Sequence, residues 1–150
     1  MGEPVIRVTE ADATDFADWL ELRNALWPHA EVESPDEMTA ILADANLVAF
    51  IARDEGEAAV GFAEAAIRGD YVNGCDTSPV GFLEGIYVAG NARRQGVARQ
   101  LVAAVAEWSR QHGCAELASD AAIDNDASHR MHAALGFSET ERVVYFRRVL

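Results

Sequence analysis

Residues 82–98 constrain the fold of this chain more than any other stretch. They begin with an apolar run of β-favouring residues that ends at Val88, and they continue into a polar loop with two arginines and a glycine. After this loop, the apolar residues of 99–112 recur at helical spacing. The pattern predicts a strand, a loop and a helix in direct succession.

The loop between this strand and this helix has the features of an anion-binding site. Gly96 allows a positive φ angle and a close approach of a ligand to the backbone. The first amides of a helix have no acceptor within the helix, and the helix dipole makes this end positive. A diphosphate would fit there, although the glycine patterns of the common nucleotide folds are absent. An ordinary surface turn with solvated arginines is the alternative interpretation.

Length and composition indicate one globular domain over residues 1–150. Hydrophobic residues make up 50% of the chain and charged residues 25%, which is typical of a folded protein and not of a disordered one. The sequence has no apolar run long enough to span a bilayer and no basic and apolar leader. We therefore expect a soluble protein of the cytoplasm that does not bind membranes.

The chain is strongly acidic, with 12 Lys and Arg against 25 Asp and Glu and a formal net charge of −13. This charge disfavours binding to nucleic acid and favours a cationic ligand, although it could serve solubility alone. The two cysteines, Cys75 and Cys114, are too few for a disulfide scaffold and lack the spacing of metal ligands. We expect reduced thiols and no metal site.

The remaining elements follow from apolar periodicity, helix caps and turn residues. In chain order we expect a strand at 4–8, helices at 14–27 and 34–44, strands at 47–52, 58–67 and 81–88, a helix at 97–112, a strand at 115–120, a helix at 126–135 and a strand at 143–149. The strands on either side of the 97–112 helix form a crossover and should be parallel. The fold class is therefore α/β, with a mixed sheet.

The loop sequence Arg-Arg-Gln-Gly-Val-Ala at 93–98 resembles the pyrophosphate loop of the GCN5-related N-acetyltransferases. The element order, Asn125 before the last helix and Leu-Gly-Phe at 135–137 agree with the same family. The resemblance implies a twisted mixed sheet in which two parallel strands splay apart, flanked by helices, and acetyl-coenzyme A as cosubstrate. It implies cofactor contacts at Ile86, Tyr87, Val88, Arg93, Arg94, Gln95, Gly96, Val97, Ala98, Arg99 and Asn125.

Five further segments resemble the aminoglycoside 6'-N-acetyltransferases, which are antibiotic-resistance enzymes. The segments are 26–28, 70–76, 82–86, 118–120 and 140–143. This resemblance implies substrate contacts at Trp27, Tyr71, Glu84, Asp120 and Glu141. Carboxylates suit a substrate with several ammonium groups, and aromatic rings can stack on the apolar faces of its sugars.

Acetyl transfer to an amine requires a base, because an alkyl ammonium is mostly protonated at neutral pH. We expect Asp120 to hold and deprotonate the 6'-amine, with assistance from Glu84. The amide of Val88 is the expected donor to the thioester oxygen. His132 stands where many acetyltransferases have a tyrosine that protonates the departing thiolate, and it could do this or simply pack.

Other interpretations stay open at this point. The same scaffold could acetylate another polyamine-like metabolite or a protein amine, or it could bind an acyl-coenzyme A or a cationic drug as a sensor. Trp27 could be a core residue, and Asp120 could cap a turn. Glu84 is the strongest anomaly, because a charge inside an apolar strand needs a partner or a function. The final strand could pair with a second subunit, and relatives of this type suggest a homodimer.

Overall fold

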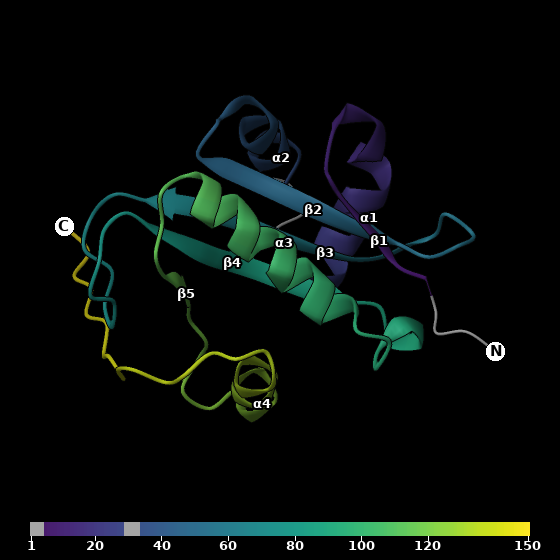
Figure 1. Ribbon diagram of the computed structural model, residues 1–150. Coiled ribbons are helices and arrows are strands. Elements are labelled where there is room, and N and C mark those ends of the chain that lie inside the picture. Colours follow the sequence, from purple (N-terminus) through teal and green to yellow (C-terminus); the bar gives the residue numbers. More distant parts are fainter. Residues whose placement is uncertain (1–4, 29–33) are drawn as a thin grey trace.

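The computed structural model describes residues 5–28 and 34–150, and Figure 1 shows how their elements are arranged. In chain order they are β1 (Arg7–Glu10), the 3-10 turn η1 (Ala13–Asp15), α1 (Phe16–Leu26), α2 (Ser34–Ala43), β2 (Leu47–Arg53), β3 (Ala59–Arg68), β4 (Val80–Val88), the 3-10 turn η2 (Gly90–Ala92), α3 (Val97–Gln111), β5 (Leu117–Ser119) and α4 (Asp126–Ala134). The five strands form one sheet in the order β1-β2-β3-β4-β5. Neighbours are antiparallel except for β4 and β5, which are parallel, as expected for a crossover through α3.

Helices cover both faces of this sheet. On one face α3 packs against β2, β3 and β4, with Leu101 fully buried in the cluster it shares with Ala63. On the other face α1 and α2 bury Trp19 and Met38 against Phe62. Because Phe62 and Ala63 are consecutive residues of β3, their side chains point to opposite faces of the sheet. The sheet therefore carries an apolar core on each side.

The helix predicted at 97–112 is α3, and a glycine with a positive φ angle lies at each of its ends. Gly96 precedes the helix with φ = 77°, and Gly113 follows it with φ = 82°. These angles lie in the left-handed region that side-chain-bearing residues rarely adopt. The sequence thus sets both the start and the end of the helix that joins β4 to β5.

The strand predicted at 143–149 is wrong. These residues form no strand, and Val144, Tyr145 and Phe146 are 78%, 80% and 91% exposed. No described strand pairs with them: the sheet ends at β1 on one side and at the three-residue β5 on the other, and β5 pairs only with β4. Figure 1 shows this yellow segment running beside the connection between β3 and β4, outside the sheet.

Smaller differences concern element ends. The first strand runs from Arg7 to Glu10 where 4–8 was predicted, and Pro4 lies outside the described residues. The strand predicted at 115–120 is shorter, at 117–119. The two helices before β2 and the hairpin between β2 and β3 agree with the sequence pattern.

Candidate active site

The parallel strands β4 and β5 pair over a short distance and then separate. β5 pairs with β4 only from Gly81 to Leu83. Beyond Leu83, β4 continues to Val88, still paired with β3 on its other side. Within the described part of the chain, the β5-facing edge of residues 84–88 is therefore open. This opening is the splay that the sequence led us to expect.

The backbone of Val88 points its polar groups into this opening. The next amide along, that of Ala89, donates to Val60 on β3 at 2.8 Å. Since successive amides of a strand point to opposite sides, the N–H of Val88 points away from β3. The carbonyl of Val88 lies on the same side and accepts a hydrogen bond from Arg93 Nε at 3.2 Å. The open edge and the arginine loop are thus directly connected.

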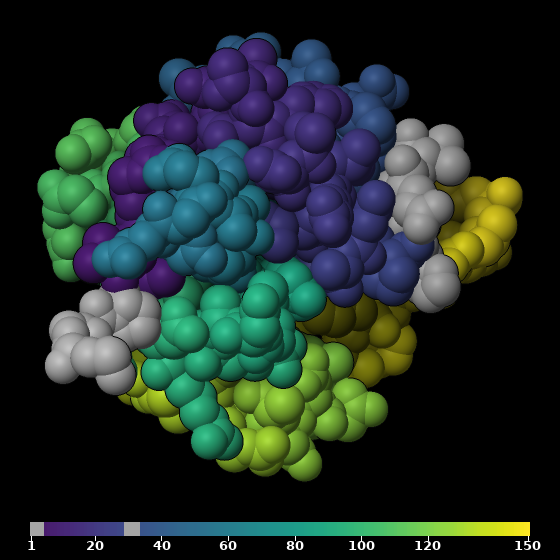
Figure 2. All heavy atoms as spheres, turned by 90° about the vertical axis from the view of Figure 1, so that its right-hand side faces the viewer, coloured from purple at the N-terminus to yellow at the C-terminus, as the bar shows by residue number. Residues whose placement is uncertain are grey.

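The loop before α3 presents backbone amides to solvent. Arg94 and Gly96 both have positive φ angles, 66° and 77°, and no side chain caps the start of α3. Val97 is buried and anchors the loop, whereas residues 93–96 are exposed. A Cβ atom at Gly96 would meet nothing within 4 Å, so the space outside the helix start is open. These features fit the pyrophosphate of a coenzyme A thioester. Figure 2 shows this end of the molecule.

Glu84 occupies a β-bulge at the mouth of the opening. In the register of β3 and β4, Gly85 is opposite Glu64 and Leu83 is opposite Ala65, so Glu84 is the extra residue. Its Oε1 accepts a hydrogen bond from Arg68 Nη2 at 2.8 Å, and its side chain is 37% exposed. The charge that looked anomalous in the sequence thus has a partner, and it stands at the surface of the site.

Asp120 lies on the opposite side of the opening, directly after β5. It is exposed, and no hydrogen bond to it is found among the described residues. Glu84 and Asp120 therefore come from the two strands that diverge, one from each.

Tyr71 and Glu141 lie on two surface segments that contact each other. Tyr71 is 70% exposed in the connection between β3 and β4. In this connection Gly74 is so close to Thr140 that a Cβ atom there would lie 2.0 Å from Thr140 Oγ1. The segment with Tyr71 and the segment with Glu141 therefore lie side by side, as Figure 1 also shows.

Glu116 ties the Tyr71 connection to the sheet. Its carboxylate accepts hydrogen bonds from the amides of Asp76 and Thr77, at 2.9 Å and 2.7 Å, and from the Thr77 hydroxyl. These bonds lower the pKa of Glu116 below its ordinary value. The connection that carries Tyr71 is thus fastened beside β5.

Trp27 packs against the inner side of β4. It caps the C-terminus of α1, and its ring makes an edge contact with Phe62, with ring centroids 5.9 Å apart. A Cβ atom at Gly85 would lie 2.4 Å from Trp27 Cζ2, so only glycine allows this approach. Trp27 is half-buried and not fully enclosed. It therefore lies beside Gly85, the residue that follows Glu84 in β4.

His132 is held between α4 and β5. Its Nδ1 lies 2.7 Å from the carbonyl of Ser128, and its Nε2 lies 2.7 Å from Ser119 Oγ. In the neutral ring Nδ1–H donates to the carbonyl, which leaves Nε2 to accept the Ser119 hydroxyl proton. Asn125, predicted to contact the cofactor, caps α4 by accepting from the amide of Ser128 at 3.1 Å. Its side-chain amide nitrogen has no hydrogen-bond partner among the described residues and can donate to a ligand.

The sequence pattern of the Acetyltransferase (GNAT) family matches residues 16–137 of this chain. The chain belongs to the GNAT acetyltransferase family. The open edge of β4, the loop before α3 and the parallel β4 and β5 are thus the family's fold, as the sequence indicated.

Individual relatives are similar over almost the whole chain. An aminoglycoside N(6')-acetyltransferase type 1 of Serratia marcescens is 59% identical over 140 residues, which cover 93% of this chain and 96% of that protein. Two solved structures are 45% identical and cover 97% of this chain and 99% of theirs. One is AAC(6')-Iy in complex with the bisubstrate analogue CoA-S-monomethyl-acetylneamine, with a TM-score of 0.93. The other is AAC(6')-Ih from Acinetobacter baumannii, with a TM-score of 0.94.

Several polar residues of this GNAT domain were not singled out from the sequence. Arg68 and Ser119 contact the predicted residues Glu84 and His132, and their own sequence surroundings are ordinary. Glu64 is different, because it interrupts the apolar run of β3 just as Glu84 interrupts that of β4. The signal that identified Glu84 would have identified Glu64 as well. Its partner is Arg23, in α1.

The cysteines do not have the properties of nucleophiles. Burial raises the pKa of the Cys75 thiol, and the nearby carboxylates of Glu116 and Asp76 raise it further. Burial alone raises the pKa of Cys114. Because the thiolate is the reactive form, both residues are less reactive than a free cysteine at neutral pH.

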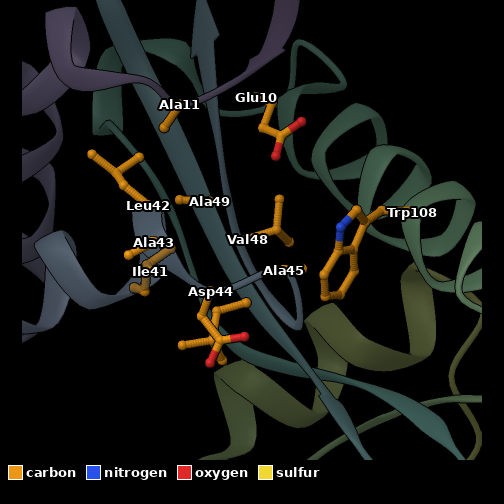
Figure 3. A pocket seen from close by; sticks show the side chains of 11 residues that line it. Glu10, Ala11, Ile41, Leu42, Ala43, Asp44, Ala45, Val48, Ala49 and Trp108 are labelled. Carbon is orange, nitrogen blue, oxygen red and sulfur yellow. The ribbon is translucent and has the colours of Figure 1, made fainter.

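A separate hollow of about 330 Å³ lies elsewhere on the molecule (Figure 3). It lies between the end of α2, the start of β2 and Trp108, which is near the C-terminal end of α3. Gly96 is at the other end of this helix, and none of the predicted site residues lines the hollow. The described residues also contain no cluster of three or more possible metal ligands and no helix long and apolar enough to cross a membrane.

Proposed function

We propose that this chain is an aminoglycoside 6'-N-acetyltransferase that transfers an acetyl group from acetyl-coenzyme A to a 6'-amine and so confers resistance. One observation carries the proposal: the open edge of β4 is flanked by one carboxylate from each diverging strand, Glu84 and Asp120. The names of the relatives support it, since they are aminoglycoside N(6')-acetyltransferases at up to 59% identity. The bisubstrate analogue bound to AAC(6')-Iy joins coenzyme A to an aminoglycoside portion.

The cofactor site consists mainly of backbone groups. The edge of residues 86–88 would pair with the pantetheine arm, and the amides of residues 94–98 would hold the pyrophosphate, with Arg93 and Arg99 beside it. Acetyl-coenzyme A supplies the activated acetyl thioester. The N–H of Val88 points into the opening and is placed to stabilise negative charge on the thioester oxygen.

The substrate site consists of side chains. Asp120 accepts a proton from the 6'-ammonium, directly or through one water, and Glu84 orients the same group. Trp27 and Tyr71 contact sugar faces, and Glu141 binds a further ammonium group. His132 can return a proton to the departing thiolate as an imidazolium, in which both ring nitrogens carry a proton: Nε2–H then donates to Ser119 Oγ, and Ser119 passes its hydroxyl proton to the thiolate. Asn125 contacts the thioester arm with its free amide nitrogen.

Release of free coenzyme A thiol tests this function. The chain should release thiol with aminoglycosides that carry a 6'-amine and not with matched compounds that carry a 6'-hydroxyl. Equal turnover of both would reject 6'-specific transfer and favour a broader amine acetyltransferase. Ligand binding by calorimetry with no turnover of either would favour a sensor.

The same proposal includes a homodimer in which the C-terminal segment of each chain pairs with its partner. Residues 143–150 are mostly β-favouring apolar residues, are exposed and have no strand partner among the described residues. Pairing with a second copy would give this segment the sheet edge that it lacks. Light scattering after size exclusion should report a dimer, and a chain ended after Arg142 should report a monomer. The proposal also places the enzyme in the cytoplasm as one catalytic domain over residues 1–150.

A further inference from the structure

Arg23 and Glu64 form a buried ion pair beneath the substrate side of the site. Arg23 is 2% exposed and Glu64 is 4% exposed. The pair is bidentate, with Nε to Oε2 at 2.6 Å and Nη2 to Oε1 at 3.0 Å. None of the functional roles assigned above uses either residue.

The Arg23 guanidinium joins three elements. Besides Glu64 on β3, it donates to Ser34 Oγ at 2.9 Å, to the Ser34 carbonyl at 3.3 Å and to Glu37 Oε2 at 2.9 Å, both on α2. Every N–H of the guanidinium thus has an acceptor. Glu64 in turn accepts from the indole nitrogen of Trp19 on α1 at 2.9 Å. The guanidinium is therefore fixed in position and orientation.

This fixed guanidinium lies against Trp27. Its Cζ atom is 5.0 Å from the centre of the Trp27 ring, at the distance of a cation–π contact. The ring is also held by the edge contact with Phe62 and by the close approach to Gly85. Arg23, Phe62 and Gly85 thus each contact the Trp27 ring.

Glu64 lies next to the β-bulge that contains Glu84. It is the residue of β3 directly opposite Gly85, and the register shift that sets Glu84 outside the ladder follows immediately after it. The ion pair therefore contacts or adjoins both Trp27 and the bulge of Glu84. Replacing a buried ion pair by apolar residues is often neutral for stability, because the desolvation penalty offsets the attraction. Such a replacement would still remove the contacts by which the ion pair positions Trp27 and the Glu84 bulge.

We propose that Arg23 and Glu64 are positioning residues that set Trp27 and the Glu84 bulge for the aminoglycoside, and this inference rests on the proposed function. The pair touches neither the cofactor loop nor Asp120. It should therefore control the KM for the aminoglycoside and leave the KM for acetyl-coenzyme A unchanged.

The test compares the single variants R23M and E64M with the double variant R23M/E64M. Each single variant leaves an uncompensated buried charge and should lower Tm, and the double variant should recover most of that loss. The double variant should still raise the aminoglycoside KM about tenfold, which is less than the ~100-fold loss that a misplacement of about 1 Å in a site can cause. A wild-type aminoglycoside KM at recovered Tm would overturn the proposal.

A matched control lies at the other end of α1. Arg53 pairs with Asp15 at 2.8 Å, and both side chains are 12% exposed. R53M should lower Tm without changing the aminoglycoside KM, and an equal rise in KM would show that destabilisation alone is responsible. If the double variant does not fold, E64Q and R23K serve instead. E64Q keeps the shape of Glu64 and R23K keeps the charge of Arg23, and both should raise the same KM by a smaller factor.

A second readout does not need turnover. The chain has three tryptophans, so their indole N–H signals can be followed separately by NMR. In R23M/E64M the Trp27 signal should shift, whereas that of Trp108, which lies in the opposite core, should not. An unmoved Trp27 signal would overturn the positioning role. If the wild type acetylated no aminoglycoside, the proposed function would fail. The NMR measurement would still show whether Arg23 and Glu64 position Trp27.

Discussion

The two halves of the proposed active site consist of different chemical groups. The cofactor half consists of backbone groups, namely the open edge of β4 and the loop before α3, and Val97 anchors it in the core. The substrate half consists of side chains from a helix end, a strand bulge, a strand end and two surface segments. Backbone groups are the same whatever side chain a residue carries, so the first half depends on conformation and the second on residue identity.

This difference predicts how each half responds to substitution. A change that keeps the backbone should leave the cofactor half intact, and only a residue with a special backbone angle should matter there. In the substrate half a single lost charge should matter without any change of fold. The predictions below test this contrast in order of decreasing effect.

The largest effect is expected from D120N. The variant keeps the shape of Asp120 but removes the charge that accepts the ammonium proton. Because a positioned base contributes about 10²–10⁴ in rate, kcat measured by thiol release should fall by about a hundredfold or more. Asp124, an exposed residue of the same loop, provides the control, and D124N should keep wild-type turnover. Near-normal kinetics of D120N would remove Asp120 from the role of base.

A smaller and selective effect is expected from G96A. Alanine at φ = 77° carries strain of about 1–2 kcal/mol, and relief of that strain would move the amides that hold the pyrophosphate. The KM for acetyl-coenzyme A should rise about fivefold, since ~1 kcal/mol corresponds to this factor. The KM for the aminoglycoside should stay unchanged.

Gly113 gives the matched control for G96A. It has φ = 82° at the other end of α3, and a Cβ atom there would also meet nothing within 4 Å. G113A therefore carries similar strain at a place remote from the loop. If both variants raised the KM for acetyl-coenzyme A equally, the loop would have no special part in cofactor binding.

E116Q should have a modest and pH-dependent effect on stability. Hydrogen bonds from Thr77 and Asp76 lower the pKa of Glu116 in the folded state, so the ionised carboxylate stabilises the fold. This contribution is fully present above the unfolded pKa of about 4.3 and is lost as the pH falls through the lower folded value. Scanning calorimetry should therefore show a Tm difference between wild type and E116Q at pH 6–8 that shrinks below about pH 4.

The control for E116Q is E107Q, which removes an exposed partner of Arg110. Surface pairs of this kind contribute little, so the Tm of E107Q should stay close to that of the wild type at every pH. A pH-independent Tm difference for E116Q would mean that the hydrogen bonds of the carboxylate do not depend on its charge.

The smallest effect is expected from C75A/C114A. Both thiols have raised pKa values, so little thiolate is present at neutral pH and alkylation by iodoacetamide should be slow. The double variant should keep the wild-type kcat in the thiol-release assay. A loss of turnover without a loss of folded protein would point to an acyl-enzyme and against direct transfer.

The same contrast explains what the sequence could predict. The strand, loop and helix at 82–111 follow from local signals, because periodicity and Gly96 act within a few residues of one another. The sequence could also single out Glu84, since its anomaly is local. It could not show that Glu84 lies in a bulge and pairs with Arg68, because both depend on the register between β3 and β4.

Apart from Glu64, the residues that were missed or misplaced depend on distant contacts. Arg23 and Glu64 are 41 residues apart in the sequence, and no local pattern links them. The alternation at 143–149 was interpreted as a strand, but a strand needs a neighbour and the sequence does not say whether one is present. Local pattern thus predicts elements, whereas pairing partners need the structure.

The contact between Gly74 and Thr140 has an evolutionary consequence. It joins two surface segments that lie outside the hydrogen-bonded sheet, and these segments carry Tyr71 and Glu141. Substitutions in these two segments can change the shape of the proposed aminoglycoside site around Tyr71 and Glu141 without disturbing either apolar core. Selection for a new antibiotic range should therefore act first on this pair of segments, and compensating changes should arise in one after a change in the other.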